Sequence, residues 1–135
     1  MAIRFLDTNI LLRHLLQDHP AQSASATRYL AAIEAGREKV RVADTVIFET
    51  VVTLQRQYGV PKPNIRDTLS PLIDLSGIVL PGKRRLREVF DLYVTSNVSF
   101  ADAYHTVLMK RWGLSEVVSY DPGFDKIPGI KRIEP

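Results

Sequence analysis

The chain contains no cysteine. Disulfide bonds and thiolate metal sites are therefore excluded, and the composition suits a reducing compartment, so we expect a cytoplasmic protein. Long apolar runs are also absent, since the longest span only a few residues and a membrane helix needs about 20. The first residues lack the charged region and long apolar stretch of a signal peptide. We accordingly expect no association with a membrane.

The composition that remains is that of an ordinary folded domain. The chain has 135 residues, of which 45% are hydrophobic, and a formal net charge of +3. This length is typical of one domain and allows a sizeable core. Neither a composition shift nor a low-complexity linker divides the sequence, so we predict a single domain over residues 1–135.

Short apolar runs alternate with amphipathic stretches along the whole chain. Strands separated by helices indicate βαβ crossovers. The pattern predicts an α/β fold, a three-layer α/β/α sandwich with a central, mostly parallel sheet. In detail, Asp44 is expected to cap its helix, Pro71 to kink or break another, and residues 121–123 to form a turn. The predicted strands are 2–7, 39–43, 78–80, 117–120 and about 131–133, and the predicted helices are 9–17, 20–36, 44–58, 64–75, 83–96 and 99–113.

Asp7 occupies the most informative position. It follows a predicted strand and precedes a predicted helix, where ligands bind in open α/β sheets. The free N–H groups at the helix start also suit a phosphate. The structural alternative is that Asp7 only forms a turn or caps the helix, and the sequence leaves both interpretations open.

Glu49 and Asp102 are further candidates, each with a structural alternative. Glu49 lies on a helix stripe opposite the apolar residues, where an ordinary solvated glutamate is also expected. Asp102 follows Ser99 at the spacing of a capping box, which supports the start of a helix. A capping role and a functional role for Asp102 are compatible.

Asp121 ends a predicted strand, as Asp7 does, and it also begins a turn sequence with proline and glycine. Asp125 lies further along the same loop, where we expect it to be solvated. Two strand-end carboxylates at one sheet edge would repel each other unless a cation lies between them. A hard divalent cation such as Mg²⁺ prefers oxygen ligands and would remove that conflict.

Four short motifs, each centred on one of these acids, together resemble the PIN-domain ribonucleases. In its short, single-domain form the chain resembles the VapC-type toxins of toxin–antitoxin pairs. The resemblance spans nearly the whole chain, and four motifs in order are more specific than any one of them. The motifs are Phe5-Leu6-Asp7-Thr8-Asn9, Val46-Ile47-Phe48-Glu49, Ser99-Phe100-Ala101-Asp102-Ala103 and Val118-Ser119-Tyr120-Asp121-Pro122-Gly123-Phe124.

The resemblance implies an endoribonuclease that uses Mg²⁺ or Mn²⁺ to hydrolyse RNA phosphodiester bonds. The acids that would bind the metal and act in catalysis are Asp7, Glu49, Asp102 and Asp121. Thr8 and Asn9 would orient the carboxylates or a metal-bound water. Ser119 stands where the family often has threonine, and it keeps the hydroxyl.

The resemblance also implies partners, namely an RNA substrate and a cognate antitoxin protein. A homodimer is expected as well. Leu11, Leu12, Leu15 and Leu16 could supply apolar surface for these contacts, although simple core burial is an equal alternative. The competing hypothesis is a catalytically inactive PIN-like module that binds RNA or protein. The presence of all four acids argues against this hypothesis.

The basic run Lys83–Arg87 is the sharpest charge feature. It could contact the phosphate backbone of RNA, which would add affinity without sequence preference. Alternatively, it is the solvated face of a helix, as most charge runs are. Positive charge at a helix start is locally unfavourable. This slightly favours the interpretation that the basic run serves a contact outside the helix.

Overall fold

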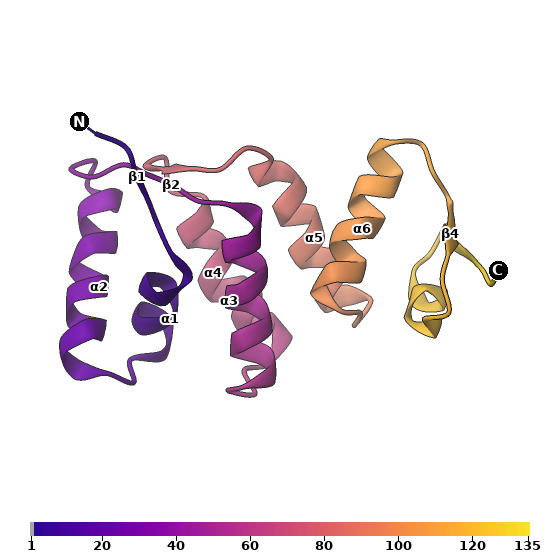
Figure 1. Ribbon diagram of the computed structural model, residues 1–135, viewed down its shortest axis with the longest axis horizontal. Coiled ribbons are helices and arrows are strands. Elements are labelled where there is room, and N and C mark those ends of the chain that lie inside the picture. Colours follow the sequence, from indigo (N-terminus) through magenta and orange to yellow (C-terminus); the bar gives the residue numbers. More distant parts are fainter. Residues whose placement is uncertain (1) are drawn as a thin grey trace. The chain divides into compact units, whose positions relative to one another are not determined.

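A computed structural model describes residues 2–135 of the chain (Figure 1). It divides the chain into two compact units, one ending at Lys83 and one spanning Arg84–Pro135. Helices and parallel strands occur in both units, so the α/β class predicted from the sequence is confirmed. No helix among the described residues is both long and apolar enough to cross a membrane.

The first unit places three short parallel strands beside four helices. Helices α1 and α2 lie side by side in Figure 1, and α3 contacts both α1 and α4. The elements in chain order are β1 (Arg4–Phe5), α1 (Thr8–Leu16), α2 (Pro20–Glu34), β2 (Val40–Arg41), α3 (Asp44–Arg56), α4 (Lys62–Ile73) and β3 (Ile78–Val79).

The strands of this unit pair in the order β1-β2-β3, with Arg4 opposite Val40 and Val40 opposite Ile78. Helices connect successive strands, as parallel pairing requires. Val40 and Ile78 are buried, so the sheet contributes directly to the core. The pairing continues to Leu6, whose N–H donates to the carbonyl of Arg41 at 2.9 Å. The strand therefore delivers the chain to Asp7 at its carboxyl end.

Local chemistry fixes the junction between α1 and α2. Gln17 ends α1 in the left-handed region, with φ 52°, and its N–H bonds to the carbonyl of Arg13. His19 then caps α2, because its Nδ1 accepts the N–H of Gln22 at 3.2 Å. Pro20 stands in the first turn, where a missing N–H costs nothing. The two helices consequently run as an antiparallel pair.

The second unit has an aromatic core and a small sheet of its own. Phe100 packs against Phe90 and Tyr93, with ring centroids 5.1 Å and 5.4 Å apart. Strands β4 and β5 pair in parallel. A 3₁₀ helix lies between them in the sequence. The elements are α5 (Lys83–Thr95), which begins at the boundary residue, α6 (Phe100–Arg111), β4 (Glu116–Val118), η1 (Pro122–Lys126) and β5 (Lys131–Ile133).

Several details differ from the sequence-based prediction. Ala43 is the cap of α3 and Asp44 its first helical residue, because the chain is still extended at Ala43. Helix α4 continues through Pro71 and ends two residues later, so the predicted break is wrong. The turn expected at residues 121–123 is present as the start of a longer 3₁₀ segment, in which Asp121 caps η1 and Pro122 is its first residue. The strands pair as two sheets, one in each unit, where one central sheet was expected.

Candidate metal centre

Asp7 stands at the start of α1 without capping it. Its backbone is extended, with φ −90° and ψ 161°, and its side chain makes no capping hydrogen bond to the helix. The residue is exposed. The structural alternative for Asp7, a capping carboxylate, is therefore not realised. The carboxylate lies where a strand ends and the N–H groups of a helix begin.

Thr8 ties this position to α3. Its hydroxyl donates to Oε2 of Glu49 at 3.1 Å, although the two residues are 41 positions apart. Thr8 is buried, with 5% of its surface exposed, whereas Glu49 is exposed. A buried hydroxyl needs a hydrogen-bond partner, so this bond restrains the Glu49 carboxylate beside the start of α1. The bond thus brings Glu49 of α3 to Thr8, the residue that directly follows Asp7.

Asp102 lies in the first turn of α6. Ser99 caps this helix, because its Oγ accepts the N–H of Asp102 at 3.0 Å. This is the capping interaction that the Ser-x-x-Asp spacing predicts. The same serine hydroxyl also bonds to the Asp102 carboxylate. The capping role and the orientation of the carboxylate therefore coexist.

Asp121 is held by the loop that it begins. Its Oδ1 accepts the N–H of Gly123 at 2.8 Å, and its own N–H donates to Oγ of Ser119 at 2.9 Å. The turn-forming role expected for Asp121 is thus present. Ser119 orients the backbone of Asp121 rather than its carboxylate, and β4 pairing reaches Ser119 through a bond to Ile133.

Asp102 and Asp121 lie close enough to interact strongly. Burial raises the pKa of Asp102, and the charge of Asp121 together with a hydrogen bond between the two carboxyl groups raises it further. The hydroxyl of Ser99 and the charge of His105 act in the opposite direction. Two carboxyl groups whose charges oppose each other in this way occupy a place that suits a cation.

The donors present fit a hard divalent ion. All are carboxylate or hydroxyl oxygens, which Mg²⁺ and Mn²⁺ prefer over softer ligands. A side chain at position 123 would crowd the pair, since a Cβ added at Gly123 would lie 3.1 Å from Oδ1 of Asp121 and 3.5 Å from Oδ2 of Asp102. Within residues 2–135, no three histidine, aspartate or glutamate side chains form a group that could hold a metal ion.

Asp125 has a different task. Its two carboxylate oxygens accept hydrogen bonds from Nε and Nη2 of Arg132, each at 3.1 Å, so the pair is bidentate. This hydrogen bonding lowers the pKa of Asp125. Arg132 also contacts Glu134 at 2.6 Å. Asp125 therefore joins η1 to β5, while its side chain stays exposed, as the sequence analysis expected.

Two participants were missed by the sequence analysis. Gly123 was assigned only to a turn, yet its lack of a side chain leaves space for both carboxylates. The Asp-Pro-Gly sequence carried that signal. The sequence analysis also assigned no role to His105, whose position one helical turn after Asp102 lets its charge act on that carboxyl group. Asn9 is exposed and lies on α1 next to Thr8.

The basic run is less uniform than its sequence suggests. Lys83 is half-buried, and its Nζ donates to the carbonyl of Leu75 at 2.8 Å. Arg84 and Arg87 are exposed, while Arg85 is half-buried. Lys83 therefore fixes the start of α5 rather than facing solvent, and Arg84 is the more accessible cation.

Comparison with known proteins decides the family. Residues 4–130 match the family model of the PIN domain, which is nearly the whole chain. The chain belongs to the PIN-domain family. A VapC ribonuclease of Aquifex aeolicus (strain VF5) is 26% identical over 133 residues, covering 98% of this chain and 97% of that protein. Ribonuclease VapC13 of Mycobacterium tuberculosis (strain ATCC 25618 / H37Rv) is 29% identical over 136 residues, covering 95% and 97%.

These findings confirm the resemblance to PIN-domain ribonucleases of the VapC type. They also confirm the PIN-like α/β fold class, since the matched region includes strands β1 to β4 and ends just before β5. Divalent-metal dependence is general among PIN nucleases of this type. The oxygen donors around Asp102 and Asp121 agree with that general property.

Proposed function

We propose that this PIN-domain protein is an endoribonuclease that hydrolyses RNA phosphodiester bonds with Mg²⁺ or Mn²⁺, as the toxin of a toxin–antitoxin pair. The observation that carries the proposal is the nearly full-length match to proteins named as ribonucleases. The intact carboxylates support it, because an inactive binding module would have no need to keep all four.

We assign Asp7, Glu49, Asp102 and Asp121 to the metal and to catalysis, within one PIN domain over residues 1–135. When bound, the ion would lower the pKa of a coordinated water and neutralise charge on the phosphate. Asp7 and Asp102 are the proposed direct ligands. For Glu49, whose carboxylate accepts a hydrogen bond from Thr8, we propose a contact to the metal through water or the role of base toward the attacking water.

The remaining residues hold these carboxylates in position. Ser99 orients Asp102 from the helix start, and Ser119 fixes the backbone that carries Asp121. Asn9 is the proposed contact to the substrate or its water. The N–H groups that begin α1 and α6 favour the approach of an anionic phosphate. Exposed Arg84 is a candidate contact to the RNA backbone.

Partners follow from the same proposal. A nuclease toxin requires a cognate antitoxin, and we propose one, together with an RNA substrate, a homodimer and a cytoplasmic location without a membrane. Leu11 is buried, whereas Leu12, Leu15 and Leu16 are half-buried. Part of this leucine cluster therefore serves the core, and the rest is available for protein contacts.

The proposal is tested by incubating purified protein with total RNA in Mg²⁺, in Mn²⁺ and in EDTA. An Asp7→Asn variant is run beside the wild type. An Asp67→Asn variant is the matched control, because Asp67 is an exposed acid that pairs with its neighbour Arg66 on α4 and is not among the proposed ligands. We expect discrete fragments that require metal, persist with the control variant and vanish with Asp7→Asn.

Other outcomes would count against the proposal. Absence of cleavage by folded wild-type protein in either metal would favour an RNA-binding or protein-binding module. Equal cleavage by the Asp7→Asn variant would show a contaminating nuclease or a wrongly assigned site. Cleavage that persists in EDTA would contradict the metal dependence.

A further inference from the structure

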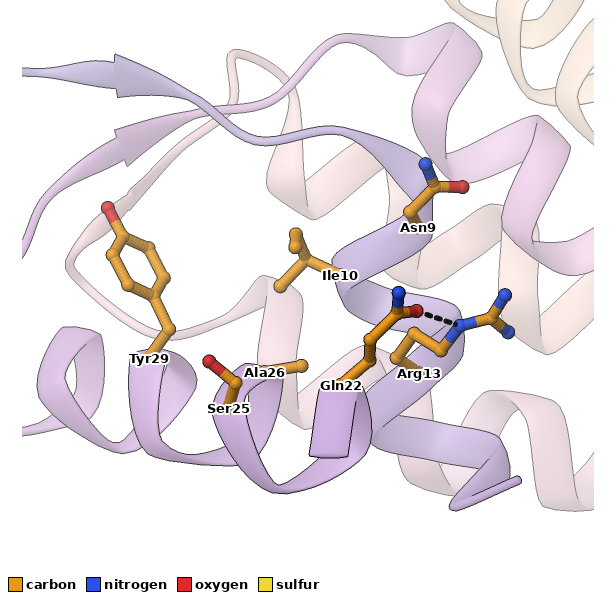
Figure 2. Close-up of a pocket in the computed structure, with 7 residues that line it drawn as sticks. All are labelled: Asn9, Ile10, Arg13, Gln22, Ser25, Ala26 and Tyr29. Carbon is orange, nitrogen blue, oxygen red and sulfur yellow. Dashed lines mark hydrogen bonds between the residues drawn. The ribbon is translucent and has the colours of Figure 1, made fainter. Parts of the chain in front are cut away.

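A pocket lies between α1 and α2, and of its lining residues the proposed hydrolysis uses only Asn9. Figure 2 shows the residues that surround it, and its volume is about 390 Å³. Ile10 and Ala26 provide its apolar lining, while Asn9, Arg13 and Tyr29 are among its polar and aromatic residues. Pockets for small organic ligands measure roughly 300–1,000 Å³, so this one has room for one small group.

The pocket lies next to the proposed centre along α1. Asn9 and Ile10 belong to the first turn of the helix that begins directly after Asp7. Arg13 follows Asp7 by six residues, which is about 9 Å along a helix axis. A substrate whose phosphate lies at Asp7 can therefore reach the pocket with an adjoining part of the same molecule.

The polar groups of the pocket are held in defined orientations. Arg13 donates from Nε to Oε1 of Gln22 at 2.9 Å, the bond drawn in Figure 2, and from Nη1 toward Asp18 at 3.4 Å. Because its oxygen faces the guanidinium, Gln22 presents its NH₂ group in another direction. Ser25 adds an exposed hydroxyl on the next turn of α2. Guanidinium, amide and hydroxyl groups such as these can form hydrogen bonds with the edge of a base.

An aromatic ring completes the pocket. In Figure 2, Tyr29 stands at the opposite end of the pocket from Arg13 and Gln22. The ring is half-buried, and its hydroxyl donates to Oε2 of Glu38 at 3.4 Å, which limits its movement. A held aromatic ring is a surface on which an unstacked base can pack.

We propose that this pocket is a base-binding subsite, which receives one unstacked base of the RNA beside the phosphodiester that is cut. This inference rests on the proposed ribonuclease activity and adds the source of its sequence preference. Single-stranded RNA is recognised by stacking of splayed bases on aromatic rings and by hydrogen bonds to their edges. A peptide helix would instead need a long apolar groove, whereas four of the seven residues that line this pocket are polar, namely Asn9, Arg13, Gln22 and Ser25.

Two neighbouring positions on α2 give a matched pair of variants. Ser25→Trp places a large ring in the pocket, whereas Ala24→Trp adds the same ring at an exposed residue that does not line it. Gln22→Glu is a milder variant, since it preserves shape and the contact with Arg13 while replacing the NH₂ donor by an acceptor. Dispersed amide spectra confirm that each variant is folded.

The first readout is binding without catalysis. The ¹⁵N-labelled full chain in EDTA is titrated with each of the four nucleoside 5′-monophosphates and, separately, with inorganic phosphate. We expect at least one nucleotide to shift amide resonances of residues 9–13 and 22–29. Its affinity should fall about tenfold or more in Ser25→Trp and remain unchanged in Ala24→Trp. Equal shifts with inorganic phosphate would overturn the proposal in favour of an anion site.

The second readout is the sequence around each cut, read from fragments of a total-RNA digest. We expect the wild type and Ala24→Trp to prefer one base at a fixed position beside the cut. Ser25→Trp should still cleave, but its preference for that base over the others should be about tenfold weaker. Gln22→Glu should change which base is favoured. Identical preferences in all four proteins would overturn the subsite.

The two readouts separate this inference from the proposed function. Nucleotide binding that Ser25→Trp abolishes, with no cleavage by the wild type, would refute the ribonuclease and leave a nucleotide pocket. Cleavage by the wild type without nucleotide-induced shifts or a changed preference would refute only the subsite. Shifts at the same residues with an amphipathic acidic hexapeptide, and with no nucleotide, would identify the pocket as a protein-docking site and overturn the proposal.

Discussion

At the scale of single residues, Thr8 contributes by holding another side chain. Its hydroxyl donates to Glu49 at 3.1 Å from a buried position. Replacing Thr8 with Val removes this donor and keeps nearly the same shape. Loss of a residue that orients a metal ligand typically costs roughly 10- to 100-fold in activity or metal affinity. We therefore expect Thr8→Val to lower kcat/KM for RNA by about tenfold or more.

The fold should tolerate this change, because exposed Glu49 regains solvent and one hydrogen bond is worth only about 1 kcal/mol. Urea unfolding measures that stability, and initial rates on a defined RNA measure the activity. Thr8→Ser is the control, since it keeps the hydroxyl and should keep most of the activity. Full activity in Thr8→Val would show that Glu49 needs no orienting hydroxyl.

At the scale of secondary-structure elements, the sequence predicted most of the architecture. Every predicted strand and helix is present, because hydrophobic periodicity and capping residues act locally. The strands are shorter than expected, for example Arg4–Phe5 against 2–7, since pairing partners decide where a strand ends. Pro71 is tolerated only two residues before α4 ends, where the helix continues for less than one turn.

Close approach between elements is information that the local pattern does not contain. A Cβ added at Gly77 would lie 2.8 Å from Cγ2 of Ile33 and 3.0 Å from its carbonyl oxygen. Gly77 also accepts the N–H of Val40 through its carbonyl at 2.9 Å, just before β3. The glycine thus allows β3 to approach both β2 and the end of α2.

Gly77→Ala should accordingly destabilise the protein. Ile33 is only 1% exposed, and a backbone carbonyl cannot move aside without disturbing its neighbours. Forcing extra volume into such a site typically costs about 1–3 kcal/mol of unfolding free energy. The midpoint of urea unfolding measures the change, with Ser76→Ala at the exposed preceding position as the control. An unchanged midpoint for Gly77→Ala would mean that β3 shifts away from Ile33 at little cost.

At the scale of the whole molecule, the sequence predicted a set of acids but not what surrounds them. Order and motif singled out Asp7, Glu49, Asp102 and Asp121, because strand ends and helix starts can be recognised locally. The bidentate pair of Asp125 with Arg132 depends on η1 meeting β5. The space beside Gly123 likewise depends on how η1 approaches α6. Both arise from tertiary packing, which a single sequence does not reveal.

The acid pair should make metal binding and overall stability depend on each other. Burial and Asp121 raise the pKa of Asp102, so the folded state holds its proton more tightly than the unfolded state does. The metal-free protein therefore loses stability as pH rises through the folded-state pKa of Asp102. Asp102→Asn removes that charge, and we expect it to stabilise the metal-free protein at pH 7 by about 0.5 kcal/mol, a small value because solvent screens a part-exposed group.

Bound metal should reverse the order of stability of the wild type and the Asp102→Asn variant. An ion that binds only the folded state adds about 2.7 kcal/mol at 100 times its dissociation constant. Titration with Mn²⁺ should consequently raise the melting temperature of the wild type by several degrees, and of the Asp67→Asn control equally, but leave Asp102→Asn nearly unchanged. Calorimetry in EDTA and then in increasing Mn²⁺ measures both effects. An equal rise for Asp102→Asn would show that the stabilising ion binds away from Asp102, and the proposed ligand set would then be wrong.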